Sequence, residues 1–146
     1  NPKFNRPWQH VLEPLRGYLA LGQNLTLTGS SDGEAFNFGP RAEQNRTVLE
    51  LLSTMASSWT ADIPNIPYEV TDDLPFKEAG LLKLNCDKAL FELKWDATLD
   101  YIQTVKMTSD WYSAYYTKEV NMFDLSLKQI DEYEHVAIAR GSSWVE

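Results

Sequence analysis

The sequence has few of the features that mark secreted or membrane proteins. It contains a single cysteine among 146 residues, Cys86, so no disulfide bond can form within the chain. It shows no signal-peptide pattern, and no apolar run approaches the ~20 residues that a membrane-spanning helix needs. We therefore expect a cytoplasmic protein, and we interpret the sequons at Asn24 and Asn45 as chance matches.

The chain is also poor in positive charge. Thirteen Lys and Arg residues stand against 21 Asp and Glu residues, which gives a net charge of −8. Affinity for a nucleic-acid backbone depends on clustered cations that release counterions, so DNA and RNA are not expected as main partners. An anionic small molecule is still compatible with this charge, because a few local cations suffice to bind it.

The motifs of common catalytic and cofactor sites are missing as well. The seven glycines do not form the strand-to-helix turn that binds a dinucleotide, and no tyrosine is followed four residues later by a lysine. His10 and His135 lack the spacing of metal ligands, so no metal site is expected. Cys86 lies beside Asp87, which disfavours a thiolate nucleophile. We therefore assign no catalytic residue and no cofactor-binding residue in this chain.

What the sequence does contain is a long helical pattern near its start. Apolar residues recur there every three or four positions, which predicts a helix from Glu13 to Leu27 whose apolar face anchors it on the core, with Pro14 in the first turn. The residues on this face are Val11, Leu15, Tyr18, Leu19, Gly22 and Leu25.

The residues before this helix form a cationic and aromatic entry made of Arg6, Trp8 and His10. Backbone N–H groups and the helix dipole favour an anion at a helix N-terminus, and Arg6 would add a bidentate fork for phosphate. The alternative interpretation is that Arg6 is a solvated surface charge and that Trp8 fills the core.

The rest of the chain alternates between helical and extended patterns. Helices are predicted over 47–59, where Thr47 and Glu50 form a capping box, and over 87–93, 99–116 and 124–139. Strands are predicted over 34–39 and 81–84, with at most a short edge strand over 68–70. This order predicts one small α/β or α+β domain over 1–146, mostly helical with a few short strands.

Three separated blocks resemble a known enzyme family. They are residues 6–19, 34–40 and 77–90 with Trp95, and the helical segment 104–112 follows them. Together they resemble the C-terminal portion of the CDP-glucose 4,6-dehydratases, over nearly the whole chain. These enzymes are extended short-chain dehydrogenase/reductases, in which an N-terminal Rossmann domain holds NAD and a smaller C-terminal part binds the nucleotide sugar.

The resemblance implies two substrate-binding residues. Arg6 matches the arginine that contacts the substrate diphosphate, and Glu78 matches an acidic residue near the nucleotide ribose. A carboxylate suits that place because it can accept hydrogen bonds from two adjacent hydroxyls. The chain departs from the family pattern at Lys77, where histidine is usual, and at Asn85, where aspartate is usual.

The resemblance also implies what this chain lacks. In the whole enzymes NAD takes a hydride from C4 of the sugar, water is lost across C5 and C6, and the hydride returns to C6. The NAD loop, the catalytic Tyr and Lys and the acid/base residues of that reaction belong to the N-terminal part. The usual role of these enzymes is to supply deoxysugars for polysaccharide biosynthesis.

The chain begins at Asn1 without an initiator methionine, so we expect a fragment or one half of a split enzyme. It would bind CDP-glucose without catalysing its dehydration. The first helix and the Phe36 strand would then present apolar surface to a missing Rossmann domain or subunit, and the isolated chain would form a homodimer through that surface. The alternative is a free-standing, non-catalytic module that binds a nucleotide sugar or a protein partner.

Overall fold

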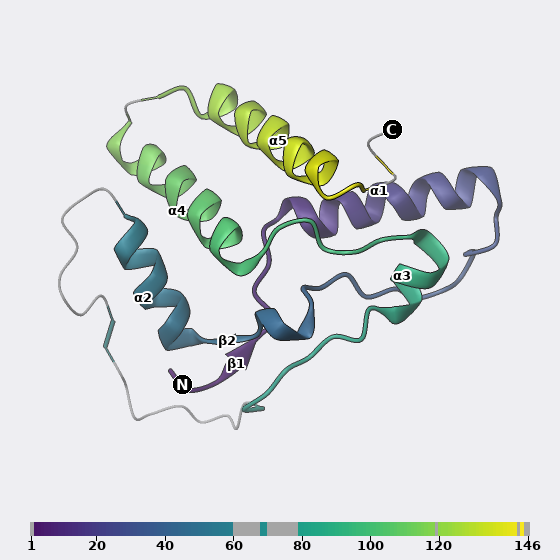
Figure 1. The fold of residues 1–146 in the computed structure, drawn as a ribbon, viewed down its shortest axis with the longest axis horizontal. Coiled ribbons are helices and arrows are strands. Elements are labelled where there is room, and N and C mark those ends of the chain that lie inside the picture. The colour runs from purple at the N-terminus through teal and green to yellow at the C-terminus, as the bar shows by residue number, and fades with distance from the viewer. Residues whose placement is uncertain (1, 60–67, 70–78, 119, 143, 145–146) are drawn as a thin grey trace.

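The computed structural model describes residues 2–59, 68–69, 79–118, 120–142 and 144. In these parts the chain forms five α-helices and a two-stranded sheet (Figure 1). The helices are α1 (Leu12–Leu27), α2 (Val48–Ser58), α3 (Asp87–Leu93), α4 (Tyr101–Thr117) and α5 (Met122–Ala139), with a short 3-10 helix, η1, at Ala42–Gln44. The strands are β1 (Asn5–Arg6) and β2 (Arg46–Thr47). The predicted mixed, mostly helical fold is confirmed.

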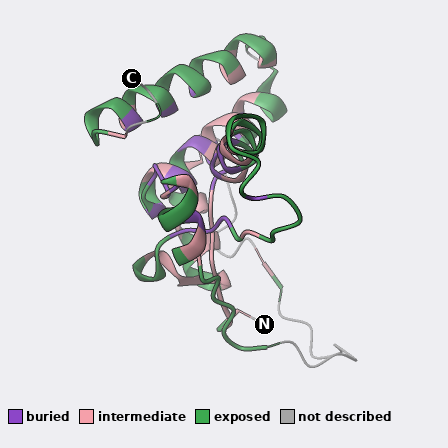
Figure 2. Ribbon diagram, turned by 90° about the vertical axis from the view of Figure 1, so that its right-hand side faces the viewer, coloured by how far each residue is buried: buried purple, intermediate pink, exposed green. Residues whose placement is uncertain are grey.

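The closest helix neighbours fall into two groups, one around α4 and one formed by α1 and α3. Helix α4 contacts α2 on one side and α5 on the other, and α1 lies against α3 (Figure 1). Figure 2 shows buried residues where the helices approach one another, while most of the outer surface of the helices is exposed. Within the described residues no helix is long and apolar enough to cross a membrane.

Capping boxes fix the starts of two of these helices. The hydroxyl of Thr47 accepts from the backbone N–H of Glu50 at 3.1 Å, and the Glu50 carboxylate accepts from the Thr47 amide at 2.7 Å. This confirms the predicted start of α2. Asp100 and Gln103 make the same reciprocal pair at the start of α4, which the sequence analysis did not identify.

The sheet is small and joins distant parts of the chain. Strands β1 and β2 are antiparallel, with Asn5 opposite Thr47 and Arg6 opposite Arg46. Leu81 forms an isolated parallel bridge to Asn5, so the strand predicted over 81–84 is wrong beyond that bridge. Its leucines are exposed because they have no sheet face to pack against. Of the edge strand predicted over 68–70, the first two residues form no strand and the third lies outside the described residues.

The strand predicted over 34–39 is also wrong, because this extended segment pairs with no other strand. Phe36 and Phe38 do lie on the same side, with stacked rings whose centroids are 6.5 Å apart. Phe38 packs against α1 at Gly17, where an added Cβ would come within 2.5 Å of the ring. It also meets Trp95 edge-on at 5.1 Å. The alternating phenylalanines therefore serve helix packing rather than a sheet.

The buried side chains form two clusters that α1 contacts through an unexpected face. One cluster contains Phe38, Ala89, Trp95 and Ala97, and the other contains Leu99, Met107 and Tyr133. The buried residues of α1 are Glu13, Arg16 and Gly17. The predicted apolar face of α1 is largely exposed instead, and of its side chains only Tyr18 has a ring contact with the core, at Phe38. The expectation that this face anchors the helix on the core is therefore wrong.

Candidate functional site

Arg6 lies in β1, six residues before the start of α1, and its guanidinium is fixed by backbone carbonyl groups. Its Nη1 donates to the carbonyl oxygen of Asn5 at 2.8 Å and to that of Ala79 at 3.0 Å. The guanidinium also lies over the ring of Phe4, 5.5 Å from the ring centroid. Arg6 is therefore a partly buried, oriented cation rather than a freely solvated one.

The second expected ligand residue, Glu78, lies outside the described residues, as does Lys77. Ala79, which accepts the hydrogen bond from Arg6, follows Glu78 directly in the sequence. Asn85 is described, and its Oδ1 accepts from the backbone N–H of Asp87 at 3.0 Å at the start of α3. An aspartate carboxylate would accept the same bond, so this departure from the family pattern preserves the local turn.

The cationic entry contains one charged residue fewer than expected. His10 is buried, and burial lowers its pKa, so the ring is neutral at pH 7. Its Nδ1 accepts from the backbone N–H of Leu12 at 3.4 Å, which leaves the proton of the neutral ring on Nε2. Trp8 is partly buried and donates from Nε1 to the carbonyl of Arg46 at 3.0 Å, which ties the entry to β2.

A buried polar network holds α1 against the segment before α4. The carboxylate of Glu13, which is only 1% exposed, accepts from the backbone N–H groups of Thr98 and Leu99 at 2.7–3.1 Å. It also accepts from the Tyr133 hydroxyl of α5 at 2.9 Å. Four hydrogen bonds thus satisfy one carboxylate and join three parts of the fold. The sequence marks Glu13 only as the start of the predicted helix and gives no local signal for this network.

Arg16 completes this network one turn further along α1. Its Nη2 donates to the carbonyl of Asp96, and its guanidinium lies between the rings of Trp95 and Trp144, 5.3 and 5.1 Å from their centroids. Burial raises the pKa of Glu13, although its hydrogen-bond donors and Arg16 oppose that rise. Burial and the nearby Glu13 charge also raise the pKa of Tyr133, which keeps its hydroxyl protonated as a donor.

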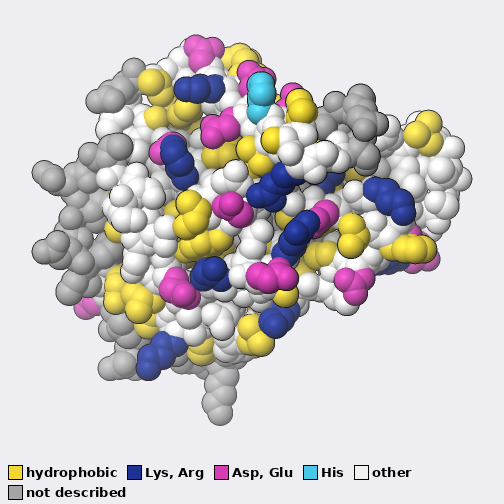
Figure 3. All heavy atoms as spheres, in the orientation of Figure 1, with side chains coloured by type: hydrophobic (Ala, Val, Ile, Leu, Met, Phe, Trp, Pro, Cys, Tyr) yellow, Lys and Arg dark blue, Asp and Glu magenta, His cyan; other side chains and the backbone are white. Residues whose placement is uncertain are grey.

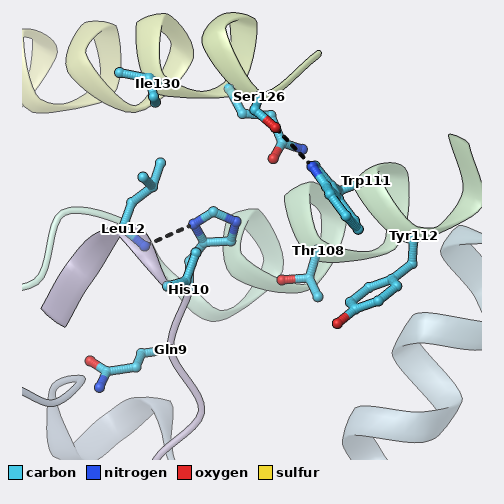
Figure 4. A pocket seen from close by; sticks show the side chains of 10 residues that line it. Gln9, His10, Leu12, Thr108, Trp111, Tyr112, Ser126 and Ile130 are labelled. Carbon is cyan, nitrogen blue, oxygen red and sulfur yellow. Dashed lines mark hydrogen bonds between the residues drawn. The ribbon is translucent and has the colours of Figure 1, made fainter. Parts of the chain in front are cut away.

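A cavity of about 480 Å³ opens between the segment before α1 and helices α4 and α5 (Figure 4). Its wall is mostly apolar and aromatic, with Trp111 and Tyr112 on α4 and Ile130 on α5. His10 lines it between Leu12 on one side and Thr108 and Trp111 on the other. Trp111 Nε1 donates to the Ser126 hydroxyl at 3.0 Å across the two helices. Arg6 is not part of this cavity, so the structure does not bring Arg6 and His10 into one site.

A second cavity, of about 610 Å³, lies between residues 39–43 and 83–87. Arg41 and Asp96 form an ion pair at its edge, in which Arg41 Nε donates to the carboxylate at 3.2 Å. Burial raises the pKa of the Cys86 thiol, which also lines this cavity. A protonated thiol is a poor nucleophile. Among the described residues, no group of three or more His, Cys, Asp or Glu could hold a metal ion.

Comparison with known proteins supports the resemblance found in the sequence. No family model matches the chain. The chain is similar to a CDP-glucose 4,6-dehydratase from Salmonella typhimurium, with 36% identity over 139 residues. The match covers 91% of this chain but 36% of the relative, so the chain spans about a third of that enzyme's length. The predicted similarity to a portion of such an enzyme is thereby confirmed.

Proposed function

We propose that this chain is the nucleotide-sugar-binding portion of a sugar-nucleotide 4,6-dehydratase and that it binds CDP-glucose without dehydrating it. The proposal rests on the similarity to the Salmonella enzyme and on the surroundings of Arg6. The remaining machinery, with NAD, the catalytic tyrosine and the catalytic lysine, would reside in a Rossmann domain or subunit that joins this portion. The assembled enzyme would work in the cytoplasm and supply a deoxysugar precursor.

The observation that carries the proposal is the hydrogen bond from Arg6 to Ala79. It joins β1 to the residue that follows Glu78, although 73 positions separate the two bonded residues. The carbonyl of Ala79 thus lies beside Arg6, and the resemblance assigns Arg6 and the residue before Ala79 in the sequence to one substrate. An arginine held by two carbonyl oxygens needs little reordering to receive a phosphate, which favours binding because less side-chain entropy is lost.

The scaffold behind Arg6 is suited to hold a ligand in register. Trp8 ties the following residues to β2, and Asn5 pairs with both Thr47 and Leu81. These contacts come from three separate parts of the chain, so Arg6 has a defined position on a rigid support. Sites on such supports bind more precisely than sites on free loops.

Calorimetric titration of the chain with CDP, CDP-glucose and dTDP-glucose tests this proposal. We expect CDP-glucose to bind and Arg6→Ala to weaken binding at least about tenfold, because loss of a charge-assisted contact costs about 1.5–3 kcal/mol. Arg140→Ala is the matched control, since Arg140 is an exposed arginine at the end of α5. Circular dichroism would verify that each variant is folded.

The titration also separates the two candidate functions. Binding of a nucleotide sugar that is indifferent to Arg6→Ala would contradict the assigned site. Absence of binding by all three ligands would favour one form of the alternative, a free-standing module that binds a protein partner rather than a nucleotide sugar. A rise in affinity when a Rossmann-containing partner is added would support the proposal, because the partner would complete the site.

A further inference from the structure

Helix α1 buries its charged side chains and exposes its apolar ones, which is the reverse of an ordinary surface helix. Its two charged residues, Glu13 and Arg16, are both buried, so its solvent-facing side carries no charged side chain. That side instead presents an apolar stripe, in which Leu19 is 75% exposed and Tyr18 is 63% exposed, although one edge of the Tyr18 ring meets Phe38, with ring centroids 5.9 Å apart. We call this surface the α1 stripe; it consists of Val11, Leu15, Tyr18, Leu19, Gly22 and Leu25. Surface helices normally bury their apolar face and expose their charged side chains.

Helix α5 provides the comparison within the same chain. It also exposes apolar side chains, including Phe123 and Ile138, but charged residues are interspersed among them. The face of the molecule in Figure 3 has the same character, with apolar side chains among Lys, Arg, Asp and Glu. Single exposed apolar residues are normal on such surfaces, whereas an uncharged apolar face along a whole helix indicates a covered surface.

Gly22 gives the α1 stripe a second unusual property. A glycine destabilises an exposed helix interior relative to alanine, so it needs a packing reason. Gly17 has one, because a Cβ there would collide with Phe38. A Cβ at Gly22 would meet nothing within 4 Å. Of the two glycines in α1, therefore, only Gly17 is explained by packing within the described residues. Gly22 leaves a shallow place on the stripe where another backbone can come close to α1.

We propose that the α1 stripe is the docking surface for the part of a dehydratase that lies outside the match to this sequence, with the closest approach at Gly22. This inference rests on the proposed function. The occupant is indicated by length, because 91% of this chain accounts for 36% of the Salmonella enzyme and most of that enzyme has no counterpart here. The docking element must itself be apolar and uncharged, since the stripe offers no charge to pair with one.

Thiol labelling in the assembled enzyme tests the docking surface. A chimera would carry this chain in place of the matching part of the Salmonella enzyme, with Cys86→Ala in all proteins. Leu19→Cys on the stripe and Leu127→Cys on α5 would be labelled in the chimera and in the isolated chain at low concentration. We expect Leu19→Cys to react at least about tenfold more slowly in the chimera, because labelling then requires local opening, and Leu127→Cys to react equally in both.

Two substitutions at Gly22 are expected to have opposite effects, one stabilising the isolated chain and the other disrupting the docked surface. Gly22→Ala should raise the urea midpoint of the isolated chain, because alanine favours the helix and has open space there. Gly22→Leu in the chimera should make Leu19→Cys reactive again, because the larger side chain separates the two surfaces. Gly17→Ala is the control for an internal glycine and should lower the urea midpoint of the isolated chain.

The outcomes decide between occupants. Equal labelling of Leu19→Cys in the isolated chain and the chimera would overturn the proposal, and so would protection in the isolated chain at low concentration, which indicates a second copy. Should the chimera fail to fold, the Salmonella enzyme itself, labelled at the positions aligned with Leu19 and Leu127, gives the same comparison. Protection without CDP-glucose binding would contradict the proposed function alone, whereas binding without protection would contradict the docking surface alone.

Discussion

Glu13 determines at the residue scale which face of α1 turns inward. Its carboxylate accepts four hydrogen bonds from two backbone amides and Tyr133, and none of these donors lies on α1. Rotating α1 to bury its apolar stripe would leave both the carboxylate and its donors without hydrogen-bond partners, and buried polar groups without partners are costly. The polar network therefore outweighs the burial of several exposed leucines.

Tyr133→Phe should lower the free energy of unfolding by about 1.5–3 kcal/mol, the usual range for a hydrogen bond to a charged group. The reason is that the hydroxyl donates to the buried Glu13 carboxylate at 2.9 Å. Urea unfolding followed by circular dichroism measures this loss. Tyr116→Phe, at a position that is 67% exposed, is the control and should change little. Equal unfolding midpoints for the two variants would contradict the role of the network.

The pH dependence of stability reports the ionisation of Glu13. Burial raises its pKa in the folded state above the value in the unfolded chain. Folding therefore favours the protonated form of Glu13. The stability that this protonation adds is fully present below the unfolded pKa and is lost as pH rises through the folded pKa. The difference in unfolding free energy between wild type and Glu13→Gln should therefore shrink as pH increases from 4.5. A difference that grows over this range would mean that the hydrogen-bond donors and Arg16 outweigh burial.

At the element scale, the helices could be predicted from the sequence and the strands could not. Periodicity and capping residues are local signals, and Thr47 with Glu50 marked the start of α2 correctly. The pairing of Asn5 with Thr47 joins strands of only two residues across more than forty positions, which leaves no local signal. Phe36 and Phe38 gave a false strand signal, because Phe38 packs against α1 at Gly17 and Phe36 stacks on Phe38.

Helix α2 offers a test of its own capping box. Thr47→Ala should lower the free energy of unfolding by about 1 kcal/mol, because the amide of Glu50 loses its side-chain acceptor. Ser57→Ala in the same helix is the control, since its hydroxyl bonds only back to the carbonyl of Thr54 in the described contacts. Thermal unfolding of both variants measures the effect. A larger loss for Ser57→Ala would show that the cap does not stabilise α2.

The site could be predicted only in part for a related reason. Arg6 was identified by its resemblance to a family residue, and the structure gives it a defined position in β1. Arg6 was expected beside the N-terminus of the first helix because it lies shortly before that helix in the sequence. Its hydrogen-bond partners are instead the carbonyl groups of Asn5 and Ala79, and the position of Ala79 depends on long-range pairing near β1. His10 was grouped with the cationic entry, but the structure buries it, and burial lowers its pKa. Its place after Gln9 in the sequence gives no sign of that burial.

At the scale of the whole molecule, the α1 stripe should make the isolated chain self-associate. Without a partner, only a second copy can cover this uncharged apolar surface. Sedimentation should show dimers that increase with concentration, and Leu19→Glu should shift the chain to monomers because it buries a charge in the contact. Phe123→Glu on α5, where the native residue is 69% exposed, should leave association unchanged. A wild-type chain that stays monomeric at high concentration would contradict this expectation.

The binding of CDP-glucose tests the central claim most directly. Calorimetric titration of the 146-residue chain should show binding that is at least about tenfold weaker in Arg6→Ala and unchanged in Arg140→Ala, as expected for loss of one charge-assisted phosphate contact. This result would mean that the chain carries a working part of a nucleotide-sugar site. Equal affinity of wild type and Arg6→Ala would contradict the assignment of the diphosphate to β1.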